Sequence, residues 1–413
     1  MELHTEERVT NGETAATAAA ATPATAAVQT AAEEFGRLYG AEPEGVWAAP
    51  GRVNLIGEYT DFNDGFVMPL ALPHTTVAAV SRRTDGVLRV HSADAPDGVV
   101  RLDIAGLTPS SGSGGWAAYP AGVVWALREA GHAVTGADIH VTSTVPTGAG
   151  LSSSAALEVA TAKALSDLFG LGLPEAELAV IAQRAENDFV GVPCGIMDQM
   201  ASACCQEGHA LYLDARDLTQ RQVPFDLVSR GLRLLVVDTQ VKHALGDGAY
   251  AERRAGCEAG ARALGLRALR DQPYEQLPDA LARLEAAGQP ENVVRYVRHV
   301  VSDDARVERA IALLDAGDIR ATGRILLDGH VSLRDDLRVS CPELDLAVSS
   351  AVAAGALGAR MTGGGFGGSA VVLIEEADAT QVTKAVEAAF AEASFTAPRI
   401  FEATPSQGVH RLR

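Results

Sequence analysis

A polar segment near the start of the chain has the side chains that a hydroxyl-rich ligand requires. It runs from Ala49 to Leu70 and reads APGRVNLIGEYTDFNDGFVMPL. Its polar residues include Arg52, Asn54, Glu58, Asp61, Asn63 and Asp64. Each hydroxyl of such a ligand must both donate and accept hydrogen bonds once water is removed, and carboxylates, amides and a guanidinium together meet that need. The same composition also fits a polar turn with helix-capping residues.

A second segment, Val145–Ala156, has the composition of a phosphate-binding loop that leads into a helix. It reads VPTGAGLSSSAA. Glycines let the backbone approach a phosphate, and the free N–H groups of a helix N-terminus attract an anion. It is not a Walker A loop, because no Gly-Lys-Ser/Thr follows. Since the loop has no cationic side chain, we expect a metal ion bound through a hydroxyl of Ser153 or Ser154; an ordinary serine-rich helix cap is the alternative.

A third segment supplies two carboxylates that could act on such ligands. Glu186 and Asp198 lie in the stretch AENDFVGVPCGIMDQMA. Gly191, Pro193 and Gly195 interrupt any helix between them, so both carboxylates can reach one cleft. There one would hold Mg2+ and the other would accept a proton. Surface carboxylates that flank a loop would give the same pattern.

The fourth segment is rich in glycine. It reads ARMTGGGFGGSAVV, with five glycines in the six positions 363–368. Such a loop can close over a ligand or pack tightly against the phosphate loop, because its backbone is not shielded by side chains. A flexible hairpin turn is the simpler alternative.

Strands and helices that would position these segments recur in both halves of the chain. The sequence predicts strands over Thr75–Ser81, Val87–His91, Asp138–Ser143, Arg233–Asp238 and Ser369–Ile374. It predicts a helix after Ser152 that ends at Gly170, a mostly helical stretch over 250–354, and a helix near 379–393. The fold class is therefore α+β, with two domains over 31–210 and 211–413.

Residues 1–30 are expected to form a disordered tail. From Thr14 to Ala27 every residue except Pro23 is Ala or Thr, so the segment has no large side chains to bury.

Composition excludes several classes of protein. The chain has 413 residues, 47% hydrophobic and 21% charged, with a net charge of −19. This negative charge argues against a broad surface for nucleic acid or an anionic membrane. The five cysteines have no metal-ligand spacing, the first residues lack the basic and apolar regions typical of a signal peptide, and the sequence has no run of about 18 apolar residues. We therefore expect a cytoplasmic protein with small-molecule partners; its oligomeric state is not encoded in these patterns, and a monomer is the simplest expectation.

Taken in order, the four segments resemble the GHMP kinase family, and the first resembles its galactokinase branch in particular. The matching motifs are GRVNLIGE-x-TD-x-N-x-G, P-x-G-x-GLSSSA-x-LEVA, CGIMDQ and TGGGFGG, spread from Ala49 to Ser369. The resemblance implies the two-domain GHMP architecture with the active site in the cleft between the domains. It also implies ATP-dependent phosphorylation of the anomeric hydroxyl of α-D-galactose to galactose 1-phosphate, the first committed step of galactose metabolism.

The resemblance further implies roles for single residues. Asp198 would take the proton of the sugar hydroxyl beside the cation Arg52, and Ser154 and Glu186 would hold Mg2+. The implied sugar-binding residues are Arg52, Glu58, Tyr59, Asp61, Gly195, Asp198 and Tyr250. The implied ATP-binding residues are Gly148, Ala149, Gly150, Leu151, Ser152, Ser153, Ser154, Trp116 and Tyr119. The two aromatic residues of this second set also suit a helix face in the core.

One position departs from the family pattern, which usually has Glu-His-Thr-Asp where this chain has Glu58-Tyr59-Thr60-Asp61. Tyrosine retains a donor, so the change bears on the contact to the exocyclic hydroxyl of the sugar rather than on phosphoryl transfer.

Two alternatives stay open. One is a kinase for another sugar, such as N-acetylgalactosamine or arabinose. The other is a non-catalytic sensor of galactose and ATP, although its pattern lacks the Ser-Ala pair that Ser154 and Ala155 form here. A mevalonate- or homoserine-type kinase fits less well, because those relatives lack the sugar-binding signature.

Overall fold

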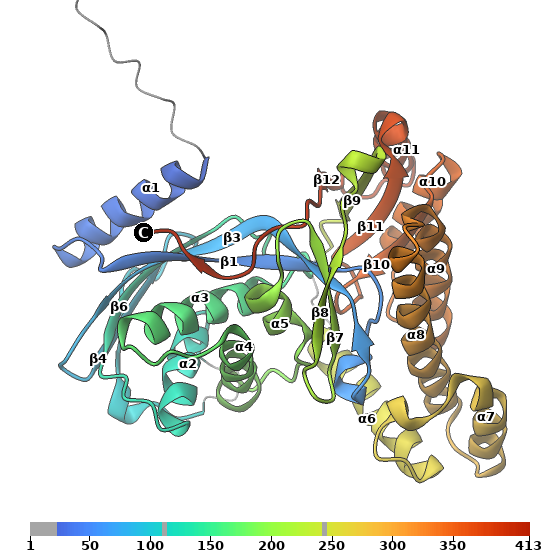
Figure 1. The fold of residues 1–413 in the computed structure, drawn as a ribbon, viewed down its shortest axis with the longest axis horizontal. Coiled ribbons are helices and arrows are strands. Elements are labelled where there is room, and N and C mark those ends of the chain that lie inside the picture. The colour runs from blue at the N-terminus through green and yellow to red at the C-terminus, as the bar shows by residue number, and fades with distance from the viewer. Residues whose placement is uncertain (1–22, 110–113, 242–245) are drawn as a thin grey trace, which may run out of the picture.

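The computed structural model describes residues 23–109, 114–241 and 246–413, and its strands form three sheets (Figure 1). The strands are β1 (Gly45–Asn54), β2 (Phe66–Val67), β3 (Pro69–Arg82), β4 (Val87–Ser92), β5 (Val100–Asp103), β6 (Ala137–Ser143), β7 (His209–Asp214), β8 (Gln220–Pro224), β9 (Leu232–Asp238), β10 (Gly358–Thr362), β11 (Ser369–Glu375), β12 (Arg399–Glu402) and β13 (His410–Arg411). The helices are α1 (Pro23–Tyr39), α2 (Ala118–Glu129), α3 (Ser153–Leu168), α4 (Glu175–Arg184), α5 (Met197–Cys204), α6 (Gly246–Leu264), α7 (Leu277–Ala286), α8 (Glu291–Asp315), α9 (Ile319–Ser332), α10 (Pro342–Ala353) and α11 (Ala379–Glu392).

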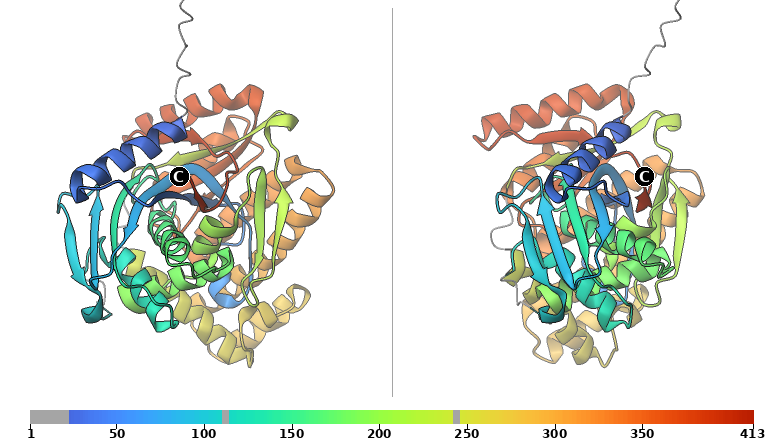
Figure 2. Two further views of the ribbon diagram at one scale, coloured as in Figure 1. Left: turned by 60° about the vertical axis from the view of Figure 1, so that its left-hand side comes forward. Right: turned by 90° about the vertical axis from the view of Figure 1, so that its left-hand side faces the viewer.

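The largest sheet has the strand order β13-β1-β3-β6-β4-β5 and is antiparallel except for the β4–β6 pair. Helices α2–α5 cover one face and α1 lies over the other (Figure 2). Side chains of β1 alternate between these layers: Val46 and Ala48 pack with Phe35 of α1, whereas Trp47 and Ala49 join the larger core. Every residue of β1 is consequently buried.

Strand β1 was not predicted from the sequence. A strand with both faces covered shows no alternation of polar and apolar residues, and Pro50 and Gly51 interrupt its pattern. The pairing register with β3 shifts between Pro50 and Arg52. A Cβ atom at Gly51 would lie 2.6 Å from the carbonyl oxygen of Leu151, so glycine is required there. The register shift thus brings β1 against residues 148–154, which we call the serine-rich loop.

The second sheet has the antiparallel order β10-β11-β9-β12. One face carries Val237 and Val372 into a core with α10 and α11, and the other carries Val236 and Val371 toward α8 and α9. The glycine-rich segment 363–368 connects β10 to β11 at the end of this sheet that faces β1. The third sheet, β2-β7-β8, is small.

The predicted strands are confirmed as β3, β4, β6, β9 and β11, and the predicted helices as α3, α6–α10 and α11. The tail prediction is wrong for residues 23–30, because α1 begins at Pro23. Alanine favours helix, and Val28 packs against the cluster around Phe35. Residues 1–22 lie outside the described residues, and the division into domains near residue 210 stays a prediction. Among the described helices, none has both the length and the apolar character needed to cross a membrane.

We predict that Phe35→Ala releases α1 from the sheet. Phe35 is 1% exposed, and truncating a buried Phe costs about 3 kcal/mol, or about a hundredfold in local opening. Hydrogen exchange of the α1 amides should accelerate accordingly. Gln29→Ala, an exposed change in the same helix, should leave exchange nearly unchanged. Equal protection in the two variants would contradict the packing role of Phe35.

Candidate active site

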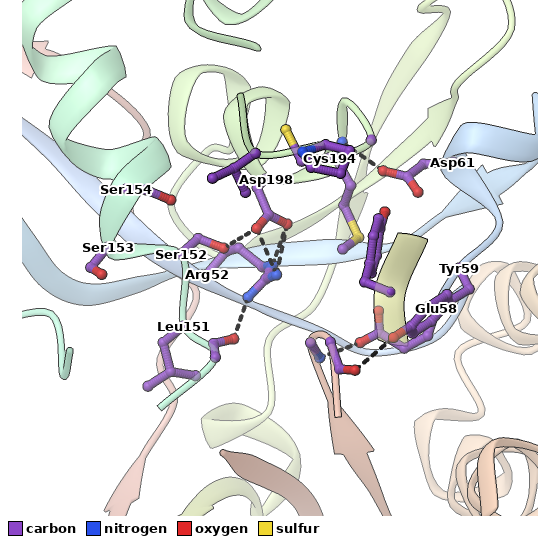
Figure 3. A pocket seen from close by; sticks show the side chains of 18 of the residues that line it. Arg52, Glu58, Tyr59, Asp61, Leu151, Ser152, Ser153, Ser154, Cys194 and Asp198 are labelled. Atoms are coloured by element: carbon purple, nitrogen blue, oxygen red, sulfur yellow. Dashed lines mark hydrogen bonds and ion pairs between the residues drawn. The ribbon is translucent and has the colours of Figure 1, made fainter. Parts of the chain in front are cut away.

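A cavity of 330 Å³ lies where the four predicted segments meet (Figure 3). The predicted site residues that line it are Arg52, Glu58, Tyr59, Asp61, Gly148, Gly150, Leu151, Ser152, Ser153, Ser154, Gly195, Asp198 and Tyr250. Figure 3 shows Ser153 and Ser154 at one end, Glu58, Tyr59 and Asp61 at the other, and Asp198 between them. The segments therefore share one cavity although they are far apart in the sequence.

A bidentate ion pair between Arg52 and Asp198 occupies the middle of the cavity. The Nε and Nη2 atoms of Arg52 donate to the two carboxylate oxygens of Asp198 at 2.9 and 2.8 Å. The Nη1 atom of Arg52 donates to the carbonyl oxygen of Gly150 at 2.7 Å. The arginine side chain is 5% exposed and the aspartate side chain 27% exposed. This geometry fixes the carboxylate in orientation while leaving part of it open to a ligand.

The serine-rich loop places backbone N–H groups at the start of α3. Gly148, Gly150 and Ser152 have φ angles of 79°, 71° and 62°, so the loop turns sharply before the helix begins at Ser153. The hydroxyl of Ser152 donates to Asp198 at 2.5 Å and so supports the carboxylate. The first N–H groups of α3 have no carbonyl of a preceding turn as partner, which is the arrangement that binds anions.

The turn that follows β1 carries the opposite end of the cavity. Glu58 is 2% exposed; its Oε2 atom accepts from Asn54 at 3.0 Å and its Oε1 atom from the N–H of Gly363 at 2.6 Å. Burial raises the pKa of Glu58, and the nearby Arg360 opposes that shift. The hydroxyl of Tyr59 donates to the carbonyl oxygen of Gly364 at 2.6 Å.

Asp61 and Gly195 fit against each other. A Cβ atom at Gly195 would lie 1.7 Å from a carboxylate oxygen of Asp61, so no other residue fits there without displacement of Asp61. The N–H of Met197, at the start of α5, donates to Asp61 at 3.2 Å. Burial raises the pKa of Asp61 to about 6, with a smaller contribution from Asp198. The ring of Tyr250 lies 5.1 Å from that of Tyr59 and completes this end.

Glu186 lies behind the serine-rich loop rather than in the cavity lining. Its carboxylate accepts from the amide of Gln199 at 2.7 Å and from the thiol of Cys194 at 3.6 Å, and it interacts with the hydroxyl of Ser154. Burial, and then Asp198, raise the pKa of Glu186 to about 7. The same amide donates at 3.3 Å to Glu158, a fully buried carboxyl whose pKa is raised well above normal by burial.

Besides Glu186, three predicted residues are not in the cavity lining. Ala149 belongs to the loop, but it is buried, and its carbonyl oxygen accepts from Ser369 at 2.8 Å. Trp116 and Tyr119 pack against the core cluster beside α2, which is the alternative that their helical spacing left open. Their role in binding ATP stays a prediction.

Sequence reasoning missed the residues that hold the turn between β1 and β2 in place, residues 55–65, called the sugar-signature turn below. Asp303 of α8 accepts from the N–H groups of Gly57 and Glu58, both at 3.0 Å. His299, one turn earlier, contacts the carbonyl oxygen of Glu58 at 3.0 Å. Both side chains are fully buried. Polar residues on the apolar face of a helix were the available signal, because His299 and Asp303 are spaced with Tyr296, Val300 and Val307.

The cavity lining contains further residues that sequence reasoning did not assign to the site. They are Val192, Pro193, Cys194, Met197, Gly363 and Gly364. All lie in or beside the third and fourth segments, so proximity to those segments was the signal that could have identified them.

Comparison with known proteins identifies the family. Models of the galactokinase galactose-binding signature, the GHMP kinase N-terminal domain and the GHMP kinase C-terminal domain match residues 33–82, 118–206 and 310–392. A galactokinase of Streptomyces coelicolor is 66% identical over 93% of this chain and 98% of its own length, and one of Streptomyces lividans is 61% identical over 90% and 92%. The crystal structure of Lactococcus lactis galactokinase complexed with galactose has a TM-score of 0.88 at 31% identity, covering 93% of this chain and 99% of that one. The chain therefore belongs to the galactokinase family, within the GHMP kinases.

Proposed function

We propose that the chain transfers the γ-phosphoryl group of ATP to the anomeric hydroxyl of α-D-galactose, giving galactose 1-phosphate and ADP. The observation that carries this assignment is the Arg52–Asp198 pair, which lies between the serine-rich loop and the sugar-signature turn in one cavity. A hydroxyl held at the turn and a nucleotide held at the loop would meet beside Asp198. Family membership narrows the sugar to galactose.

Asp198 is the proton acceptor in this proposal. Its carboxylate is oriented by Arg52 and Ser152, so one oxygen can face the anomeric hydroxyl without rotation of the side chain. Phosphoryl transfer through a loose transition state depends on position and charge neutralisation more than on a strong base. Arg52 contributes to both, because the same guanidinium that orients Asp198 also places positive charge near the reacting oxygens.

The sugar would bind at the turn after β1. Glu58, Asp61 and Tyr250 face this end of the cavity, together with Tyr59 and the backbone of Gly195. Carboxylate oxygens have about four acceptor positions, so Glu58 can accept from a sugar hydroxyl in addition to its bonds within the protein. The nucleotide phosphates would bind the backbone of the loop from Gly148 to Ser154 and the N-terminus of α3.

Ser154 and Glu186 fit a magnesium site. Both supply hard oxygen donors, and they already interact with each other. Among the described residues no group of three or more metal-binding side chains occurs, which suits an ion completed by phosphates and water. Mg2+ would neutralise charge on the phosphate oxygens when bound. A dication beside Glu186 would also keep this carboxylate ionised against its raised pKa.

We also place the reaction in the cytoplasm and expect a monomer. All five cysteines are free thiols, as a reducing compartment requires.

A panel of acceptors tests the proposed function. We expect ADP release with galactose to exceed, by at least about tenfold, that with glucose, N-acetylgalactosamine, arabinose, mevalonate or homoserine; a hydroxyl-reading site discriminates by this margin or more. A stronger response to another sugar would reassign the substrate. Galactose binding without any ADP release would instead support the sensor.

We predict that Asp198→Asn lowers kcat by about 10²–10⁴-fold, because loss of a general base has effects of this size. Galactose affinity, measured by calorimetry, should change little. Asp188→Asn, an exposed carboxylate in the same segment, is the matched control and should retain normal turnover. Retention of more than about a tenth of the wild-type kcat by Asp198→Asn would reject the assigned role.

We predict that Glu186→Gln raises the Mg2+ concentration for half-maximal activity on the order of tenfold, because an amide is a weaker ligand for a hard cation. Glu177→Gln, an exposed change on α4, serves as the control. The measurement is a Mg2+ titration at constant free ATP. Superimposable titrations of the Glu186→Gln variant and the wild type would exclude Glu186 as a ligand.

A further inference from the structure

The glycine-rich hairpin, residues 363–368, has little that fixes its own shape. Gly363, Gly365 and Gly368 have φ angles of 82°, 79° and 75°, a region that residues with side chains rarely adopt. Phe366 is the only residue of the hairpin that is not glycine. Its conformation therefore depends on contacts with neighbouring segments.

One set of contacts joins the hairpin to the sugar-signature turn. The N–H of Gly363 donates to Glu58 at 2.6 Å, and the hydroxyl of Tyr59 donates to the carbonyl oxygen of Gly364 at 2.6 Å. Tyr59 is 4% exposed and lines the cavity. Its backbone φ of 64° lies in the left-handed region, which residues other than glycine rarely adopt. This backbone conformation directs the side chain toward the hairpin (Figure 3).

A second set joins the hairpin to the serine-rich loop. A Cβ atom at Gly363 would lie 2.7 Å from the carbonyl oxygen of Gly150, so the two backbones are in direct contact. Ser369, the first residue of β11, donates through its hydroxyl to the carbonyl oxygen of Ala149 at 2.8 Å. Gly363 thus takes part in both sets of contacts.

We propose that Tyr59 is a positioning residue that couples the two substrate sites: through its bond to Gly364, galactose binding restrains the hairpin and so favours nucleotide binding at the serine-rich loop. The inference rests on the proposed function. Gly363 and Gly364 line the cavity, and Gly363 also contacts the serine-rich loop. In this proposal both ligands bind best when the hairpin is restrained, so the ligand that binds first lowers the ordering entropy that the second must overcome. The effect is reciprocal, because a coupling free energy acts equally on both binding equilibria.

The hydroxyl of Tyr59, rather than its ring, is the coupling element. Phenylalanine at this position keeps the ring packing against Tyr250 but removes the donor to Gly364. Tyr59→Phe therefore separates the positioning role from the shape of the sugar site.

Calorimetry without turnover measures the coupling directly. The galactose Kd is determined with and without a saturating magnesium complex of adenylyl imidodiphosphate, a non-transferable ATP analogue. We expect the analogue to tighten galactose binding at least about fivefold in the wild type. Tyr59→Phe should lower this ratio at least about threefold, toward one; because Tyr59 also lines the sugar end of the cavity, the ratio of the two Kd values, and not the Kd for galactose alone, is the readout.

Two further variants make the result specific. Tyr39→Phe is the matched control, because Tyr39 also donates to a backbone carbonyl, that of Ile139 at 2.9 Å, on the large sheet; its ratio should equal that of the wild type. Ser369→Ala removes the bond from the residue that follows the hairpin to Ala149 of the serine-rich loop and should lower the ratio as Tyr59→Phe does. In this proposal the Tyr59 and Ser369 contacts lie on one path between the two substrate sites, so the loss of either interrupts it. The double variant should therefore lose little more coupling than either single variant.

The outcomes distinguish this inference from the proposed function. A wild-type ratio near one, or equal ratios in the wild type and Tyr59→Phe, would overturn the coupling role while leaving the kinase assignment intact. If the losses of coupling in the two single variants added up in the double variant, the hairpin would not be the path that connects the two substrate sites. A wild-type chain that binds neither galactose nor the analogue would overturn the proposed function together with the inference.

Discussion

The ion pair between Arg52 and Asp198 is the interaction on which the site depends. Its partners are separated by 146 positions in the sequence, so it forms only when β1 and α5 are both in place. Among the described residues, Arg52 is the only arginine or lysine that lines the cavity. Loss of Arg52 would leave Asp198 without a counter-charge, close enough to Asp61 and Glu186 to raise their pKa values.

This arrangement explains how an acidic site can accept a polyanionic nucleotide. Burial and Asp198 together raise the pKa values of Asp61 and Glu186, so the negative charge is spread over groups that do not all ionise easily. In the proposed mechanism, phosphate charge is met instead by backbone N–H groups of α3 and by a divalent ion. The number of lysine and arginine residues is therefore a poor guide to whether the ligand is anionic. A helix dipole and a bound metal ion can neutralise the charge of a ligand in place of side chains.

The sequence was sufficient to predict which segments line the cavity, because the residues suited to this chemistry are concentrated in short segments. Arg52, Asp198 and the serines of the loop stand in motifs whose composition already indicates phosphate and hydroxyl recognition. The supporting elements were harder to predict. Strand β1 is buried on both faces and has no alternating pattern, while Asp303 and His299 lie more than 200 positions from the turn that they hold. Tertiary contacts of this kind leave no local signal beyond a polar residue on an apolar helix face. Trp116 and Tyr119 illustrate the reverse case, since their helical spacing was compatible with both a core position and a ligand contact.

The short strand β13 affects the order in which the protein can be completed during synthesis. It pairs with β1 at Trp47 and Ala48, and Leu412 donates to the carbonyl oxygen of Val46 at 2.8 Å. Strand β1 also carries Arg52, so the strand that presents this arginine to the candidate site has an unpaired edge until the ribosome has extended the chain beyond residue 411. An open edge invites pairing with other chains. The first sheet, although encoded early, therefore reaches its protected form only after translation of the second, and a nascent chain of this protein is most vulnerable to association during that interval.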